Sequence, residues 1–119
     1  MSNPMIDVAS LAKLKDMIGG DSEDLAELVD DFVTAFPAQA ETMQTLASEE
    51  NWTALRIDAH SCKSNARDLG ATALSELCAK LELDCKGGAP SDAAAQVQEI
   101  QSQGMQALSA LREIDLTNV

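Results

Sequence analysis

Residues 59–82 read AHSCKSNARDLGATALSELCAKLE and divide into two amphipathic segments at Gly70. Before the glycine, apolar or small residues recur in steps of four and three, as Leu55, Ala59, Cys62, Ala66 and Leu69. After it the helical period resumes, with Leu74, Leu77, Cys78, Leu81 and Cys85. This spacing places each set on one face of an α-helix. The stretch therefore predicts two helices that turn back on each other at Gly70.

The helical period continues on the N-terminal side of this stretch. A short helix is expected within residues 6–18, ended by Gly19 and Gly20. A long helix follows, with Asp21 or Ser22 as its N-cap. Pro37 lies inside it and is expected to kink the helix rather than end it, because the apolar period resumes beyond the proline.

Two further caps complete the helix predictions. Asn51 is the expected N-cap of the helix that carries residues 55–69, and Ser91 that of a last helix after the Gly87–Pro90 turn. No segment alternates as a strand would, and aromatic residues make up only 3% of the chain. The fold class expected is all-α: an antiparallel up-down-up-down four-helix bundle with a short additional N-terminal helix, forming a single domain over residues 1–119.

The overall charge excludes several classes of partner. The formal net charge of −12 argues against nucleic acid and against anionic membrane surfaces, both of which need a basic face. No apolar run approaches a membrane span, and the N-terminus lacks the pattern of a secretory signal. The three cysteines are expected to be reduced thiols in a core, without a zinc site. A cytoplasmic, monomeric protein is the expectation, with the acidic excess serving solubility or the choice of partner.

The single histidine of the chain, His60, lies among positive charges. On a helical wheel Arg56, Lys63, Ser64 and Arg67 fall within about 60° of it, on the side away from the apolar seam. No basic residue occurs between Asp16 and Leu55, so this cluster is exceptional in the chain. An exposed cationic patch around an imidazole suits a phosphoryl group, because nearby cations disfavour ring protonation and stabilise transferred phosphate charge. The other interpretation of the same pattern is an ordinary solvated helix face.

Residues 59–82 also resemble a known family. Ala59-His60, Lys63-Ser64, Gly70-Ala71, Leu74, Leu77-Cys78 and Leu81-Glu82 match nearly every fixed position of the histidine-phosphotransfer (HPt) domain of bacterial multistep phosphorelays. The long upstream helix with Phe32, Phe36 and Pro37 is similar to the second helix of that family. The resemblance implies a phosphorelay intermediate with this helical fold.

The resemblance implies a role for each matching residue. His60 would accept the phosphoryl group at its outer ring nitrogen, and Lys63 would neutralise phosphate charge. Ser64 stands where glycine is commonest in the family and, being small, leaves room for the partner. Glu82 would hydrogen-bond the inner ring nitrogen and orient the ring, unless it is an ordinary exposed acid. Arg67 is a second candidate for contact with phosphate or partner.

The partners implied are receiver domains of response regulators and of hybrid sensor histidine kinases. Ile57 is a candidate receiver contact, or else a partly buried boundary residue. No cofactor is expected in this chain, because the Mg²⁺ used in such transfers belongs to the receiver. No ATP binding or kinase activity is expected, since the chain has no glycine-rich phosphate loop.

Two other classes of function remain open from the sequence. The bundle could be a non-catalytic module that binds receivers or a kinase, as a phosphate sink or inhibitor. It could also be an unrelated enzyme with His60 as a general base, although such a base needs a cleft and an orienting carboxylate.

Overall fold

The computed structural model describes residues 5–119, which form five α-helices and one short 3₁₀ helix and contain no strand. The α-helices are α1 (Val8–Met17), α2 (Ser22–Ser48), α3 (Trp52–Asp68), α4 (Thr72–Lys86) and α5 (Ala93–Glu113), and η1 (Leu116–Asn118) ends the chain. The prediction of an all-α fold is confirmed over these residues.

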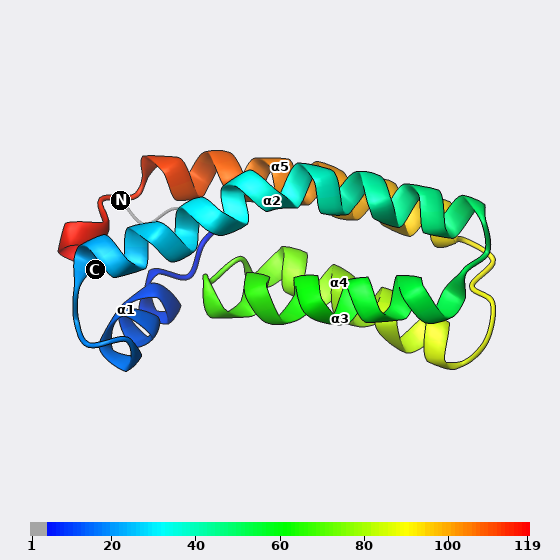
Figure 1. Cartoon of the computed structure of the whole chain (residues 1–119), viewed down its shortest axis with the longest axis horizontal. Coiled ribbons are helices and arrows are strands. Elements are labelled where there is room, and N and C mark those ends of the chain that lie inside the picture. The colour runs from blue at the N-terminus through cyan, green and yellow to red at the C-terminus, as the bar shows by residue number, and fades with distance from the viewer. Residues whose placement is uncertain (1–4) are drawn as a thin grey trace.

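The helices form an elongated bundle of 43 × 24 × 20 Å. The long helices α2 and α5 run along one side of the bundle, and α3 and α4 run along the other (Figure 1). Helix α1 packs against α2 and α3 at one end of the molecule (Figure 1). Helices α3 and α4 make the most extensive contact of any pair. The α3–α4 hairpin, which contains the stretch 59–82, is therefore the most extensive helix pairing of the fold.

The N-caps predicted for α2 and α3 are present, and the prediction for α5 is wrong. The side chain of Asp21 accepts a hydrogen bond from the backbone N–H of Glu23 at 2.8 Å, and that of Asn51 accepts one from Ala54 at 3.2 Å. The N-cap of α5 is Asp92, not Ser91, and its carboxylate accepts from the side chain of Gln96 instead of from the backbone. Helix α2 continues through Pro37 without a break, as expected.

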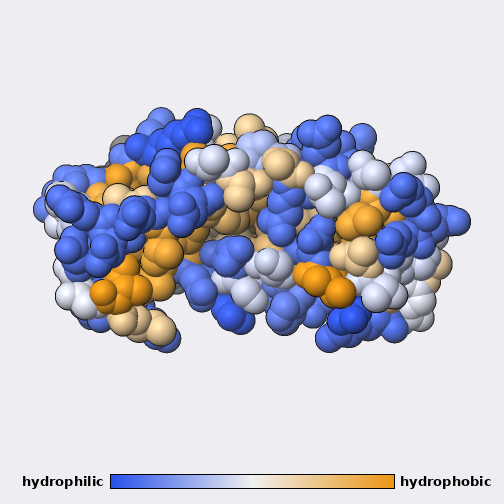
Figure 2. Space-filling model, in the orientation of Figure 1, coloured by the Kyte–Doolittle hydropathy of each residue, from blue (hydrophilic) through white to orange (hydrophobic). Residues whose placement is uncertain are grey.

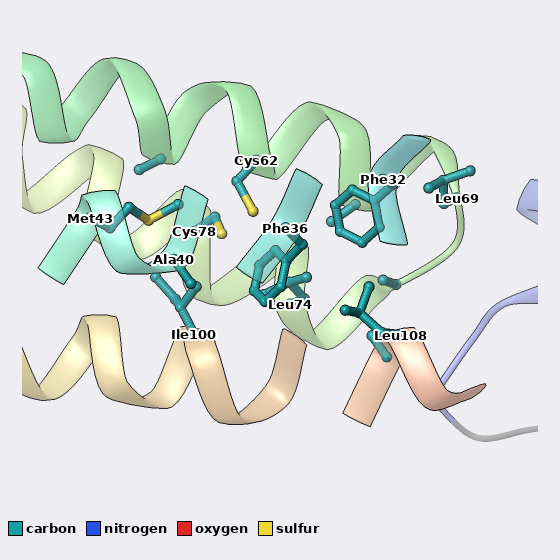
Figure 3. Close-up of a cluster of buried hydrophobic side chains, with 14 of the residues drawn as sticks. Phe32, Phe36, Ala40, Met43, Cys62, Leu69, Leu74, Cys78, Ile100 and Leu108 are labelled. Carbon is teal, nitrogen blue, oxygen red and sulfur yellow. The ribbon is translucent and has the colours of Figure 1, made fainter. Parts of the chain in front are cut away.

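The core consists of aliphatic, sulfur-containing and a few aromatic side chains between the two helix pairs (Figure 3). Phe36 of α2 is fully buried, and a Cβ at Gly104 of α5 would lie 1.9 Å from its ring. The absent side chain at Gly104 thus makes room for this ring. The three cysteines are buried free thiols, and a hydrogen bond with Cys62, together with burial, raises the pKa of Cys78. The prediction that the three cysteines lie in the core is confirmed.

Gly70 joins the α3–α4 hairpin to the start of α1. Its φ of +81° lies in the left-handed region, and a Cβ there would lie 2.4 Å from the carbonyl oxygen of Asp7. The N–H of Asp7 donates to the Gly70 carbonyl at 2.8 Å, and the Asp7 carboxylate caps α1. A glycine is needed here both for its backbone conformation and for the close approach of the backbone at Asp7.

Candidate functional site

The site is built around Glu82, a carboxylate buried between α3 and α4. Glu82 is the one charged residue in the buried class among residues 5–119, and its side chain is 7% exposed. The hairpin is held in register nearby, where the Ser75 hydroxyl donates to the Lys63 carbonyl at 3.1 Å. A buried carboxylate is costly unless it is paired, so its partners determine what this part of the molecule can do.

The first partner of Glu82 is His60. The Nδ1 atom of His60 lies 2.8 Å from Oε2 of Glu82, while the His60 side chain is 59% exposed. An ionised carboxylate is only an acceptor, so Nδ1 is the donor in this hydrogen bond. In the neutral ring the lone pair is then on Nε2, the nitrogen that Glu82 does not engage. The pair fixes the tautomer and the orientation of an exposed imidazole.

The second partner is Lys63, one helical turn after His60. Its Nζ lies 2.6 Å from Oε1 of Glu82, and its side chain is 23% exposed. The hydrogen bond from Lys63 is the largest cause that lowers the pKa of Glu82 to about 2; burial opposes it, and the hydrogen bond from His60 adds to it. Glu82 is therefore ionised throughout the physiological range, and it connects His60 with Lys63.

A third cation at Glu82 was missed by the sequence reasoning. Lys86, in the last turn of α4, has its Nζ 3.6 Å from Oε2 of Glu82. The sequence signal for it was the spacing of four residues between Glu82 and Lys86, which places both on one helix face. No other cation of the described residues lies within ion-pair distance of this carboxylate.

The remaining predicted residues, Ser64 and Arg67, lie on α3 with His60 but do not contact Glu82. Ser64 is half-buried, one turn beyond His60. The Arg67 side chain is 67% exposed, and its Nε lies 3.9 Å from the Asp68 carboxylate. Arg67 also lines a hollow with Lys13 and Met17 of α1. The structure thus brings together His60, Lys63 and Glu82, and it does not bring Arg67 to them.

Apolar surface occurs near this site. Ile57, one turn before His60, is 56% exposed and is therefore not a partly buried boundary residue. A groove of about 350 Å³ lies between α1, α2 and α3 and begins one turn beyond His60. Its lining includes Leu28, Phe32 and Asn65. Figure 2 shows apolar patches at the α1–α2 end of the molecule and a smaller one over α3, on an otherwise largely hydrophilic face.

Residues 5–119 contain neither a cluster of metal-ligating side chains nor a helix suited to cross a membrane. No group of three or more His, Cys, Asp or Glu side chains in this part of the chain is placed to hold a metal ion. Over the same residues, the helices include none with the length and apolar character of a membrane span.

The protein is a small all-helical bundle that presents one imidazole at its surface. A buried carboxylate orients this ring, and a lysine lies beside it. These features define it as a histidine-bearing helical domain. The sequence matches the family model of the Hpt domain over residues 27–114. Because this match covers most of the chain, the protein belongs to the Hpt domain family, and the resemblance noted in residues 59–82 is confirmed.

The fold also resembles that of a solved structure. The crystal structure of histidine-containing phosphotransfer protein B (HptB) from Pseudomonas aeruginosa PAO1 is similar with a TM-score of 0.84 and 23% sequence identity, over 94% of this chain and 95% of that one. At this identity the likeness concerns the fold. A comparison with curated protein sequences gives no match.

Proposed function

We propose that this protein is a phosphorelay intermediate that carries a phosphoryl group on His60. It would accept the group from the phosphoaspartate of one receiver domain and pass it to the aspartate of another. Membership of the Hpt family supports phosphotransfer as the general function. The observation that carries the assignment to His60 is its hydrogen bond to Glu82, which directs Nε2 away from the carboxylate.

The transfer of the phosphoryl group to His60 needs no proton donor. The lone pair of Nε2 attacks phosphorus, the bond between phosphorus and the aspartyl oxygen breaks, and the aspartate leaves as a carboxylate. The ring then carries a positive charge, with its proton still on Nδ1 and donated to Glu82. The buried carboxylate stabilises that charge, and the same steps in reverse return the group to a receiver.

The residues beside His60 have matching roles in this proposal. Lys63 would neutralise charge on the phosphoryl oxygens, since it lies one turn along the same helix. Ser64 would leave space for in-line approach of the receiver. Arg67 is proposed to contact the surface of the receiver rather than the phosphoryl group, because it lies away from the Glu82 cluster.

The receiver is proposed to dock over His60 through apolar contacts. Exposed Ile57 and the groove beside Leu28 and Phe32 supply apolar surface on either side of the histidine along α3. Receivers of response regulators and of hybrid sensor kinases are the partner class, and the Mg²⁺ used in the transfer would be held by the receiver. No cofactor, ATP binding or nucleic-acid partner is part of this proposal.

Residues 1–119 would act as one domain and as a monomer in the cytoplasm. The short connections between consecutive helices support the antiparallel up-down-up-down order expected from the sequence.

The third sequence interpretation, a general-base enzyme, was disfavoured because such a base usually lies in a cleft, whereas His60 was expected on the outward face of a helix. Glu82 does supply the orienting carboxylate that a general base also needs. What disfavours this function is the exposure of His60 and membership of the Hpt family.

The test uses phosphorylated receiver domains from a panel of hybrid kinases. Each is mixed with the wild-type protein and with the His60→Gln variant, and acid-labile, alkali-stable label is scored. Label on the wild type alone is expected. Label retained by the folded variant would contradict the assignment of His60. Equal receiver binding by both proteins without any transfer would favour the non-catalytic binding module.

A further inference from the structure

The buried carboxylate of Glu82 has more cationic partners than the proposed transfer accounts for. His60 lies at 2.8 Å, Lys63 at 2.6 Å and Lys86 at 3.6 Å. His60 carries the phosphoryl group and Lys63 neutralises it. Neither role involves Lys86, which comes from the end of α4 rather than from α3.

The contact of Lys63 with Glu82 conflicts with its proposed role at the phosphoryl group. Its ammonium is close to Oε1 of Glu82, on the Nδ1 side of the imidazole, whereas the phosphoryl group would be on Nε2. If Lys63 turned to the phosphoryl oxygens, Glu82 would keep the hydrogen bond from His60 but lose its strongest ionic partner. Glu82 would then be a buried anion without its closest cation, next to a phosphoryl dianion. The repulsion between the two anions and the cost of the poorly paired carboxylate would oppose the transfer.

Lys86 is suited to remove this conflict. It lies four residues after Glu82 on the same helix, and its long side chain is 55% exposed. Its Nζ lies 3.6 Å from Oε2 of Glu82, whereas that of Lys63 lies 2.6 Å from Oε1, so Lys63 is the closer partner of the carboxylate. Lys86 is therefore a nearby charge that can shorten its contact with Glu82 when Lys63 leaves.

We propose that Lys86 is a positioning residue that closes onto Glu82 when Lys63 turns to the phosphoryl group on His60. The exchange keeps the carboxylate paired, so that it continues to hold Nδ1 and the ring orientation. This inference rests on the proposed function, since it assigns Lys86 a part in the same transfer. Its action is indirect, because Lys86 contacts Glu82 and not the reacting atoms.

The chain contains a matched control for Lys86. Lys80 is on the same helix and is 58% exposed, but its Nζ is paired with Asp84 at 3.0 Å. Lys80→Gln and Lys86→Gln therefore remove the same charge from the same helix with similar exposure, and only the second removes a partner of Glu82. Lys86→Arg keeps the charge and serves as the rescue variant.

The first measurement is the rate of transfer from a phosphorylated receiver, as a function of receiver concentration. For Lys86→Gln we expect the saturating rate to fall about fivefold, the effect of a single ion pair of about 1 kcal/mol, with the half-saturating receiver concentration unchanged. Lys86→Arg and Lys80→Gln are expected to behave as the wild type. Equal rates for Lys86→Gln and Lys80→Gln would overturn the proposal, as would a change confined to the half-saturating concentration.

The second measurement does not depend on transfer. The pKa of Glu82 is followed by carbon NMR of its carboxyl group, in the wild type and in Lys63→Gln, each with and without Lys86→Gln. In the Lys63→Gln background, which imitates the departure of Lys63, losing Lys86 is expected to raise the pKa by about half a unit or more. In the wild-type background the rise should be clearly smaller. Equal rises in the two backgrounds would overturn the exchange, even if the wild type carries phosphate. Absence of transfer by the wild type, with unequal rises, would instead contradict the proposed function and leave the carboxylate exchange supported.

Discussion

The Nζ of Lys63 lies 2.6 Å from Oε1 of Glu82, so the lysine expected to neutralise phosphate already has a buried anionic partner. Glu82 also accepts from Nδ1 of His60. One carboxylate therefore connects the nucleophile with the cation beside it. A change at Glu82 should consequently affect both the orientation of the imidazole and the position of the lysine.

Replacement of Glu82 by alanine should slow the phosphorylation of His60. The variant loses the acceptor for Nδ1–H and the anion that stabilises the charged ring, and we expect a rate loss of about tenfold or more. The measurement is the rate of transfer from a saturating phosphorylated receiver. Glu76→Ala, which removes an exposed acid of the same helix, is the control. A wild-type rate in Glu82→Ala would show that the hydrogen bond to His60 has no part in the transfer.

The lowered pKa of Glu82 predicts how stability depends on pH. The folded value of about 2 is below the ordinary value of 4.5, so the unfolded chain binds more protons between these values. The stabilisation is complete above the unfolded pKa and is lost as pH falls through 4.5 toward 2. Between pH 5 and 3 the free energy of unfolding of the wild type should fall more steeply with pH than that of Glu82→Gln. The mean difference in slope should correspond to about 0.7 of a bound proton. Urea unfolding at each pH measures both slopes, and parallel slopes would mean that the carboxylate is not held ionised in the fold.

Much of the fold and part of the site follow from local sequence patterns. The helical period of the apolar residues predicted all five α-helices. Asn51 is the N-cap of α3 as predicted, and of the two candidates for α2, Asp21 and Ser22, the cap is Asp21. The Ser91 prediction failed because α5 begins at Ala93, one residue later than expected, with Asp92 as its N-cap and no side-chain hydrogen bond to the helix backbone. The wheel of α3 placed His60 and the cations on the outward face, where His60 lies.

The contacts between helices could not be predicted from such patterns. Lys86 and Glu82 share a face of α4, but only the packing of α3 on α4 brings that face to His60. The wheel likewise put Arg67 near His60 in angle, whereas its distance along the helix leaves it beside Asp68 and α1. Angular proximity on one helix therefore did not predict which residues form the cluster.

Ile57 should contribute to receiver binding and not to folding. Its side chain is 56% exposed one turn before His60, so Ile57→Ser removes little buried surface within this chain. If the receiver covers it, we expect binding to weaken by about tenfold, typical of the loss of a large apolar contact at an interface. The affinity for a receiver is measured by calorimetry. Leu83→Ser is the control, since Leu83 is similarly exposed on α4. Equal effects of the two substitutions would place the receiver elsewhere.

Gly70 and Gly20 allow two costs of replacing a glycine to be separated. Both have φ near +80°, but a Cβ at Gly20 meets no atom within 4 Å, whereas one at Gly70 would lie 2.4 Å from the Asp7 carbonyl oxygen. Gly20→Ala should destabilise the protein by about 1 kcal/mol, the cost of the left-handed conformation. Gly70→Ala should cost about 1–3 kcal/mol more, because the start of α1 must move away from the α3–α4 turn. Urea unfolding of the two variants measures the difference. Equal losses would mean that the contact between Asp7 and Gly70 relaxes without cost, and that α1 is not held at this turn.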